Sequence, residues 1–236
     1  MVTHDQRVLE LHNGYRGRCF MLGNGPSLLR QDLTPLQRES TFVCNAFPKW
    51  KERPFEPTFY GVTDIIQKPF LDSLMPYVET LETPWKFNVQ WASRREVHDD
   101  RLIYVEKAPD HVQVQGDGLV GLGDELPPIP TGRTTPLTLV QLALWFGFRE
   151  LYFLGFEQHG GYVYDPDAIR THQGYQMERH VRYYRAIQRC AERARAEIEA
   201  AGGTLADCTP DGYLTGQYKE IPAKAVLPYK RFEELL

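Results

Sequence analysis

Residues 18–28 read Arg-Cys-Phe-Met-Leu-Gly-Asn-Gly-Pro-Ser-Leu, a short apolar run that ends in a glycine-rich turn. We interpret it as a buried strand, a tight loop and a helix with Pro26 at its first position. Backbone N–H groups and a helix N-terminus would then meet at a strand end, which favours binding of phosphate. The spacing matches neither the P-loop nor the GxGxxG motif, and an ordinary tight turn is the alternative interpretation.

Strands and helices alternate along the rest of the chain. One predicted helix begins at Thr134-Thr135-Pro136, is apolar nearly all round and ends near Phe146; an amphipathic helix follows from about Gln173 to Ala201. This alternation predicts an α/β fold: a Rossmann-like, mostly parallel sheet with helices on both faces. Besides residues 18–22, the predicted strands are 41–45, 58–63, 85–89, 102–105, 150–154 and 204–208.

Two segments lack clear periodicity, residues 108–133 and 156–175. Long loops in a compact domain are usually functional or mobile. Ligands of such sheets bind beyond the carboxyl ends of the strands, so we expect both segments to form a lid there. We predict one nucleotide-binding domain over residues 1–236, a length that is ample for a hydrophobic core.

Composition excludes several classes of protein. Apolar residues make up 42% and charged residues 25%, which excludes disordered and fibrous chains. The net charge of −4 indicates no nucleic-acid surface. No apolar run approaches the roughly 18 residues of a membrane span, and no signal-peptide core is present. Four scattered cysteines suit a reducing compartment, so we expect a cytoplasmic protein.

Thr131-Gly132-Arg133-Thr134 offers a second helix start for an anion, where the Arg133 guanidinium could pair with phosphate oxygens. Two such sites in one domain suit a ligand with one or two phosphates. His159, His172 and His180 follow later; His172 directly precedes the long helix, whose dipole keeps its imidazole neutral and available as a base.

Tyrosines and carboxylates supply further candidates. Tyr162 and Tyr164 could donate hydrogen bonds to an anionic leaving group. Asp64 and Asp165-Pro-Asp167 are the carboxylates available for Mg²⁺, although Asp-Pro-Asp is also a common turn composition. We expect no metal site, and no histidine spacing supports zinc.

Three segments resemble a group of uncharacterised bacterial proteins: Phe20-Met-Leu-Gly-Asn-Gly-Pro-Ser-Leu28, Val43-Cys-Asn45 and Gly147-Phe-Arg-Glu-Leu-Tyr-Phe-Leu-Gly155. Residues 207–214 and 232–236 are similar to the ending of these proteins, so the resemblance spans nearly the whole chain. The group is similar to bacterial sialyltransferases that use CMP-sialic acid. It is also similar to archaeal-type 6-hydroxymethylpterin diphosphokinases, which share the glycine loop.

The sialyltransferase resemblance implies roles for individual residues. Asn24, Ser27 and Asn45 match positions that contact CMP in that family, and Tyr162 matches a tyrosine that steadies the departing phosphate. His159 replaces the second such tyrosine. Other positions are also carried over from the resemblance: Thr131-Gly132 is similar to the family's second helix start, Glu157 replaces an aspartate, and His172 is the nearest match to the histidine base, without the local H-Y-x-G-H pattern.

We therefore expect a metal-independent glycosyltransferase that uses a nucleotide sugar, a CMP-sugar by resemblance, and a saccharide acceptor. His172 would act as base, while Tyr162, His159 and Arg133 would stabilise the leaving phosphate. The predicted nucleotide-binding residues are Gly23, Asn24, Gly25, Ser27, Asn45, Asp64, Thr131, Gly132, Thr134, Gly155 and Glu157.

Two alternatives stay open. One is Mg²⁺-dependent pyrophosphoryl transfer to a pterin-like alcohol, with Asp64 and Asp165 or Asp167 as ligands. The other is a nucleotide-binding module without catalysis. Cofactors are not expected outside the Mg²⁺ alternative. The sequence leaves open the donor sugar, the linkage, a homo-oligomeric state and a peripheral membrane contact of residues 228–232.

Overall fold

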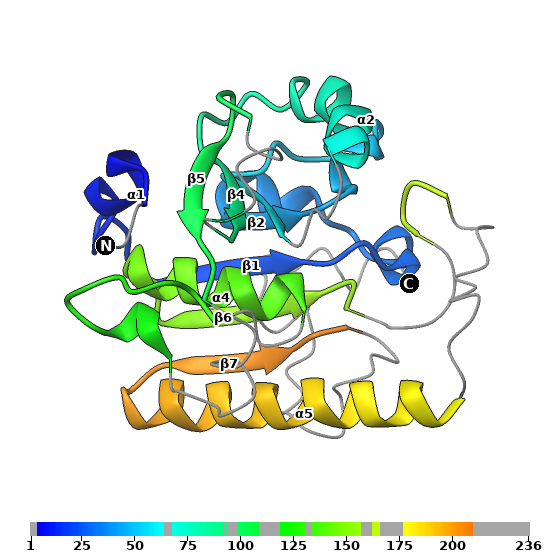
Figure 1. The fold of residues 1–236 in the computed structure, drawn as a ribbon. Helices are drawn as coiled ribbons and strands as arrows, with labels where there is room; N and C mark the ends of the chain where they lie inside the picture. Colours follow the sequence, from blue (N-terminus) through cyan, green and yellow to red (C-terminus); the bar gives the residue numbers. More distant parts are fainter. Residues whose placement is uncertain are drawn as a thin grey trace.

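The computed structural model describes residues 4–63, 68–91, 93, 99–108, 119–130, 134–156, 162–165 and 177–209, with only the backbone for 177–186. They form a seven-stranded sheet of order β5-β4-β3-β2-β1-β6-β7 (Figure 1). Every neighbouring pair is parallel, which confirms the predicted α/β fold. All the predicted strands are present: β1 (Arg18–Leu22), β2 (Ser40–Cys44), β3 (Phe59–Thr63), β4 (Lys86–Gln90), β5 (Ile103–Glu106), β6 (Glu150–Leu154) and β7 (Thr204–Asp207).

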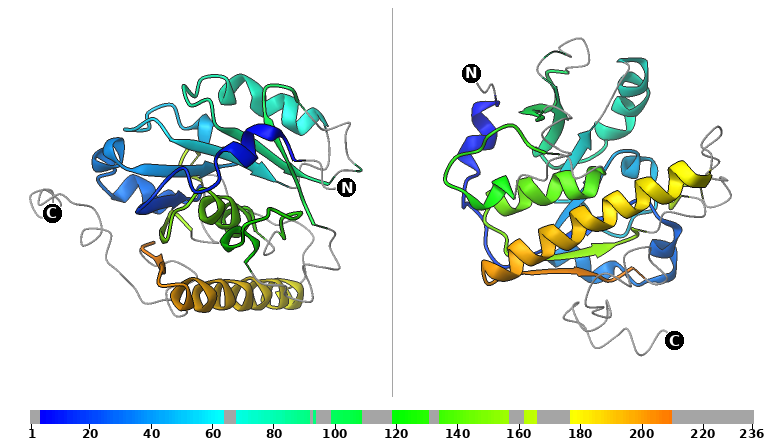
Figure 2. Two further views of the ribbon diagram at one scale, coloured as in Figure 1. Left: turned by 90° about the vertical axis from the view of Figure 1, so that its left-hand side faces the viewer. Right: turned by 60° about the horizontal axis from the view of Figure 1, so that its bottom comes forward.

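Helices cover both faces of the sheet (Figure 2). Two separate clusters of buried apolar side chains lie on the two faces, so the sheet is buried on both sides as a parallel sheet requires. One face carries η1 (Pro26–Arg30), η2 (Thr34–Arg38), η3 (Phe47–Lys49) and α2 (Lys68–Val78); the other carries α1 (Gln6–Glu10), η5 (Val120–Leu122), α4 (Thr135–Trp145) and α5 (Met177–Ala200).

The predicted buried helix is α4. All its residues are buried, and it packs across β1, β2 and β3. Gly147, with φ of +107°, ends the helical path as expected. In α5 the described residues Ile187, Ala191, Ala194 and Ile198 are buried at the predicted spacing, while the side chains of Met177, Val181 and Tyr184 lie outside the described residues.

Two helices differ from the prediction. The helix expected at Pro26 is the five-residue 3₁₀ helix η1, which lies between the extended residues Gly25 and Gln31. It therefore has too few aligned peptide groups for a strong helix dipole. Helix α2 was not predicted, because Pro69 and Pro76 interrupt the sequence pattern; Pro76 lies inside the helix but is exposed.

Residues 119–130, which belong to the predicted lid segment 108–133, pack against the core. The amides of Val120 and Gly121 donate to Oε1 of Gln141 in α4 at 3.0 and 3.4 Å. Ile129 is fully buried, and its amide donates to the Glu106 carbonyl at 2.9 Å. Residues 119–130 thus pack on α4 and β5. Residues 109–118 and 131–133 lie outside the described residues.

The four cysteines, all within the described residues, form no disulfide bond. Among the helices in the described ranges, none has both the length and the apolar character needed to cross a bilayer.

Candidate functional site

A close contact between two glycines joins the loops that follow β1 and β6. The amide of Gly23 donates to the Leu154 carbonyl at 2.8 Å, and that of Gly25 donates to the Gly155 carbonyl at 2.9 Å. A Cβ atom on Gly23 would lie 2.2 Å from the Gly155 oxygen. Gly155 has φ of +64°, and a Cβ there would lie 2.6 Å from the Leu28 side chain. The two loops are therefore fixed against each other.

The N–H groups of Gly23 and Gly25, which the sequence predicts to bind an anion, donate hydrogen bonds within this contact. Leu28 also donates to the Gly25 carbonyl at 3.3 Å, and Pro26 has no N–H. The amides of Gly23 and Gly25 are therefore engaged by main-chain carbonyls. Both glycines and Ser27 are buried, so Asn24 and Pro26 are the parts of this loop that reach the surface.

Hydrogen bonds connect the glycine loop to the start of α4. Nδ2 of Asn24 donates to the Cys44 carbonyl at 3.2 Å, and Nδ2 of the next residue, Asn45, donates to Oγ1 of Thr135 at 3.2 Å. The Thr63 hydroxyl, at the end of β3, lies 2.6 Å from the same Thr135 oxygen. The ends of β1, β2 and β3 and the first residue of α4 thus meet at one edge of the sheet, which we call the carboxyl-edge site.

Asn45 is held on several sides. Its backbone is left-handed, with φ of +50°, a conformation that asparagine tolerates better than most residues. Its carbonyl accepts a hydrogen bond from the Tyr60 hydroxyl at 2.9 Å. Burial raises the pKa of Tyr60 far above its usual range, so this hydroxyl stays protonated and donates. The Oδ1 atom of Asn45 is buried and accepts no hydrogen bond from a described residue.

Cys44, beside Asn24, is not an activated nucleophile. Its thiol lies 3.8 Å from Nδ2 of Asn24 and is buried. Burial raises the pKa of this thiol to about 12, so it stays neutral at physiological pH.

A short hairpin over residues 162–165 lies against the glycine loop. The backbones of Tyr162 and Asp165 exchange two hydrogen bonds of 2.9 and 3.0 Å, and the amide of Val163 donates to the Asn24 carbonyl at 2.9 Å. The rings of Tyr162 and Tyr164 stack with centroids 5.1 Å apart. The structure therefore places Tyr162, a predicted leaving-group residue, next to Asn24.

Lys49 also belongs to this region, although it is not among the residues predicted from the sequence. It is half-buried at the end of η3, four residues after Asn45 in the chain. Its Nζ atom lies 5.6 Å from the ring centroid of Tyr77 and 5.8 Å from that of Tyr164. Its position just after a strand end is the one signal that could have pointed to it, since the run Pro-Lys-Trp-Lys-Glu is typical of a solvated loop.

Other predicted residues contribute less to the described site. Thr134 occupies the N-cap position of α4, but its side chain makes no capping hydrogen bond. Asp165 is exposed, and the described residues contain no group of three histidine, cysteine, aspartate or glutamate side chains suited to a metal ion. The remaining candidates lie outside the described residues: Asp64, Thr131, Gly132, Arg133, Glu157, His159, Asp167 and His172.

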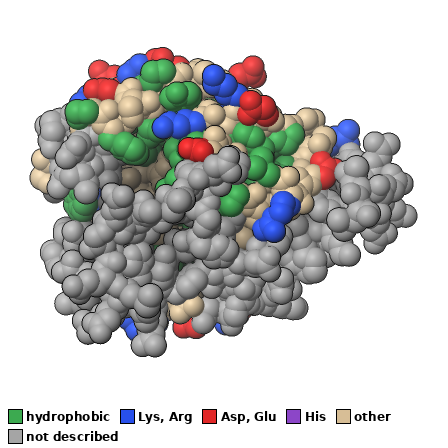
Figure 3. All heavy atoms as spheres, turned by 90° about the vertical axis from the view of Figure 1, so that its right-hand side faces the viewer, with side chains coloured by type: hydrophobic (Ala, Val, Ile, Leu, Met, Phe, Trp, Pro, Cys, Tyr) green, Lys and Arg blue, Asp and Glu red, His purple; other side chains and the backbone are tan. Residues whose placement is uncertain are grey.

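Figure 3 views the molecule from the side toward which β1, β6 and β7 run in Figure 1. Described hydrophobic side chains gather there, with lysine, arginine and acidic side chains among them.

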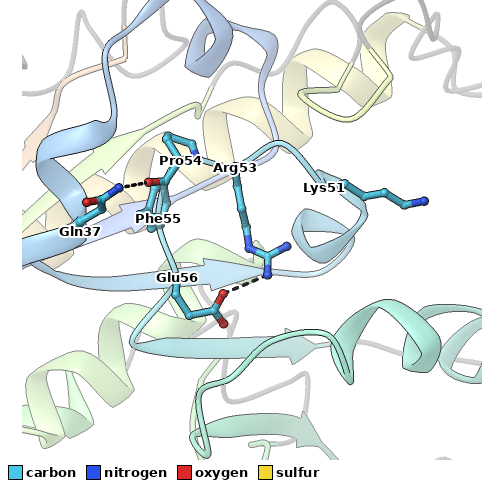
Figure 4. Close-up of a pocket in the computed structure, with 6 residues that line it drawn as sticks. All are labelled: Gln37, Lys51, Arg53, Pro54, Phe55 and Glu56. Carbon is cyan, nitrogen blue, oxygen red and sulfur yellow. Dashed lines mark hydrogen bonds and ion pairs between the residues drawn. The ribbon is translucent and has the colours of Figure 1, made fainter.

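Two hollows are lined by described residues other than those of the carboxyl-edge site. One, of about 450 Å³, is in the loop before β3 (Figure 4). There Arg53 pairs with Glu56 at 3.0 Å, Gln37 donates to the Pro54 carbonyl at 2.6 Å, and Lys51 extends away from the pair. Another, of about 440 Å³, lies at the C-terminal end of α4 beside Trp145. Neither contains a residue predicted to bind a nucleotide.

No protein-family model matches the chain, and no curated protein matches its sequence. Solved structures do. The sialyltransferase CstII from Campylobacter jejuni, in complex with the substrate analogue cytidine-5'-monophosphate, is 13% identical, with a TM-score of 0.50 over 87% of this chain and 85% of that chain. The shared feature is the fold.

Two further sialyltransferase structures match at lower TM-scores. CST-II in complex with a trisaccharide acceptor and CMP is 14% identical, with a TM-score of 0.47 over 87% of this chain and 86% of that chain. The monofunctional α-2,3-sialyltransferase Cst-I from Campylobacter jejuni is 12% identical, with a TM-score of 0.47 over 86% of this chain and 79% of that chain.

Proposed function

We propose that this protein is a glycosyltransferase of the sialyltransferase kind, which takes its sugar from a CMP-sugar and needs no metal ion. The observation that carries the proposal is the hydrogen-bonded convergence of Asn24, Asn45 and Thr135 at the carboxyl-edge site. Ligands of parallel α/β sheets bind at this edge. The fold is shared with CstII, a sialyltransferase solved with CMP.

The chemistry of Asn45 suits a nucleoside. Its Nδ2 is engaged with Thr135, which leaves its buried Oδ1 as an acceptor. A buried acceptor without a donor costs about 1–3 kcal/mol, so a ligand hydroxyl or amino group is expected to compensate for it. Ribose hydroxyls and the amino group of cytosine are such donors.

The proposed reaction is a direct displacement. The oxygen of an acceptor hydroxyl bonds to the anomeric carbon, the bond from that carbon to the phosphate oxygen breaks, and CMP leaves with the electron pair. His172 accepts the hydroxyl proton. Tyr162 donates a hydrogen bond to the phosphate, and Arg133 and His159 add to the stabilisation of its charge. The roles of these four residues rest on the sequence and on the resemblance.

Nucleotide binding tests the proposal first. Thermal shifts are measured with CMP, CDP, UDP, GDP, GTP and ATP, each with Mg²⁺ or with EDTA, because a ligand of the folded state raises its stability. We expect CMP to raise the melting temperature in EDTA. A shift with ATP or GTP that requires Mg²⁺ would favour pyrophosphoryl transfer instead, and no shift with any nucleotide would contradict the proposal.

Turnover tests the base. We expect His172→Ala to abolish CMP release from a CMP-sugar in the presence of a saccharide acceptor. CMP affinity should change by no more than a few-fold, because the base contacts the acceptor rather than the nucleotide. Retained turnover would remove His172 from this role.

A further inference from the structure

We propose that Lys49 supplies a positive charge, in addition to that of Arg133, which binds the phosphate of the nucleotide at the carboxyl-edge site. The inference rests on the proposed function. The sequence predicts that amides of the glycine loop bind the phosphate; the inference assigns this binding to the Lys49 side chain.

The need for such a residue follows from the hydrogen bonds of the loop. A phosphate that leaves water requires donors or a cation at close range. Gly23, Gly25 and Leu28 already donate to main-chain carbonyls, and Pro26 has no N–H. These four positions therefore leave no N–H for a phosphate, which gives a side-chain cation near the loop a role in binding it.

The backbone around Lys49 is fixed. Its amide donates to the Ala46 carbonyl at 3.0 Å, and the amide of Trp50 donates to the Phe47 carbonyl at 2.9 Å. The Phe47 side chain is fully buried. The start of the Lys49 side chain is therefore held at a constant position relative to Asn45.

The ammonium group of Lys49 is held by aromatic rings rather than by a carboxylate. Tyr77 from α2 and Tyr164 from the hairpin lie within about 6 Å of Nζ, the range of cation–π attraction. Among the described residues no acidic side chain pairs with it, whereas Lys68 pairs with Asp72. Neutral rings orient the ammonium group without neutralising it, so its charge stays available to an anion.

Tyr164 connects Lys49 to the rest of the site. Its ring stacks on Tyr162, and their hairpin is hydrogen-bonded to the Asn24 carbonyl through Val163. Lys49, Tyr162 and Asn24 thus belong to one chain of contacts. The ligand chemistry that fits it is a phosphate ester with a hydrogen-bonding nucleoside attached.

The test compares CMP with cytidine, which lacks the phosphate. Calorimetry with wild-type protein should show tighter binding of CMP. In Lys49→Met we expect a loss of about 10- to 100-fold in CMP affinity, typical of a charge-assisted hydrogen bond, with cytidine affinity unchanged. Lys49→Arg should keep the preference for CMP. Lys51→Met is the matched control, because this exposed lysine extends beside the hollow of Figure 4.

Several results would overturn the inference. Equal losses for CMP and cytidine in Lys49→Met would assign Lys49 a structural role. If Lys49→Met leaves CMP affinity unchanged and weakens only the binding of a CMP-sugar that carries a carboxylate, the Lys49 ammonium group pairs with the sugar carboxylate rather than with the phosphate. Pyrophosphate is titrated in parallel. If wild-type protein binds pyrophosphate through Lys49 but does not bind CMP, the result contradicts a CMP-sugar as the donor and supports the anion site at Lys49. Protein that binds neither contradicts both proposals.

Discussion

At the residue scale, Asn45 combines a backbone role with a side-chain role, and two substitutions separate them. Asn45→Gly removes the whole side chain and keeps the left-handed backbone accessible. Asn45→Ala removes only the amide group and keeps a β-carbon at a positive φ, which costs about 1–2 kcal/mol relative to glycine. We expect the alanine variant to be the less stable by that amount in urea unfolding, and both variants to bind CMP more weakly.

Wild-type CMP affinity in Asn45→Gly would remove the Asn45 side chain from the nucleotide site. Equal stability of the two variants would show that the backbone relaxes away from the left-handed conformation.

The contact between the glycine loop and Gly155 predicts a second difference in stability. Gly155 and Gly202 have similar φ angles, +64° and +78°, but a Cβ on Gly202 would meet nothing within 4 Å. Gly202→Ala should therefore lower the free energy of unfolding by about 1–2 kcal/mol, because alanine is strained at a positive φ. Gly155→Ala should cost about 1–3 kcal/mol more, because the new methyl group overlaps Leu28. Urea midpoints measure both, and equal losses would contradict the close contact.

At the element scale, His4 fastens the segment around α1 to the sheet and to residues 119–130. Its Nδ1 accepts the amide of Glu106 at 3.0 Å, and its Nε2 donates to the Leu126 carbonyl at 2.9 Å. This pair of bonds requires the neutral ring, since an imidazolium has no acceptor. Burial lowers the pKa of His4, although the carbonyls of Leu126 and Pro127 oppose the shift.

This lowered pKa predicts a loss of stability in mild acid. The unfolded chain binds a proton near pH 6.5 and the folded chain only at lower pH, so the contribution of His4 is complete above about pH 6.5 and falls as the pH decreases. His4→Asn keeps an acceptor for Glu106 and does not titrate. Between pH 7 and pH 5 the free energy of unfolding should fall more steeply in wild type than in this variant; parallel curves would contradict the assignment.

Some elements and site residues could be predicted from the sequence, and others could not. The strands were predictable because each is a short apolar run bounded by turn residues, as in Arg18–Leu22 and Glu150–Leu154. Helix α2 was not predictable, because its two prolines interrupt the helical pattern and proline is typical of loops. Asn24 and Asn45 could be selected as strand-end residues, but Lys49 depends on rings from α2 and from the hairpin, and no local pattern contains that contact.

At the scale of the whole molecule, the sheet has β2 at its centre, paired with β1 on one side and β3 on the other. Helix α4 packs across β1, β2 and β3, so neither half of the sheet has a core of its own. We therefore expect the described residues to unfold as one cooperative unit.

Two tryptophans test this expectation, because Trp50 lies in the buried cluster on one face and Trp145 in the cluster on the other. Because the chain also has Trp85 and Trp91, both are replaced by Phe. Adding Trp50→Phe or Trp145→Phe to that protein then leaves one tryptophan, on the opposite face, as the fluorescence reporter. We expect the fluorescence midpoint of each variant to coincide with its midpoint by circular dichroism. Separate transitions within either variant would show that the two layers unfold independently.

The complete burial of α4 also has a consequence for synthesis of the chain on the ribosome. Its strand partners β1, β2 and β3 precede it in the sequence, but β6 and α5, which complete the same apolar cluster, follow it. A nascent chain that ends at residue 149 therefore exposes apolar surface of this cluster to the cytosol or to the translation extract. Such a chain should be a substrate for chaperones, and its release from them should require synthesis of β6 and α5.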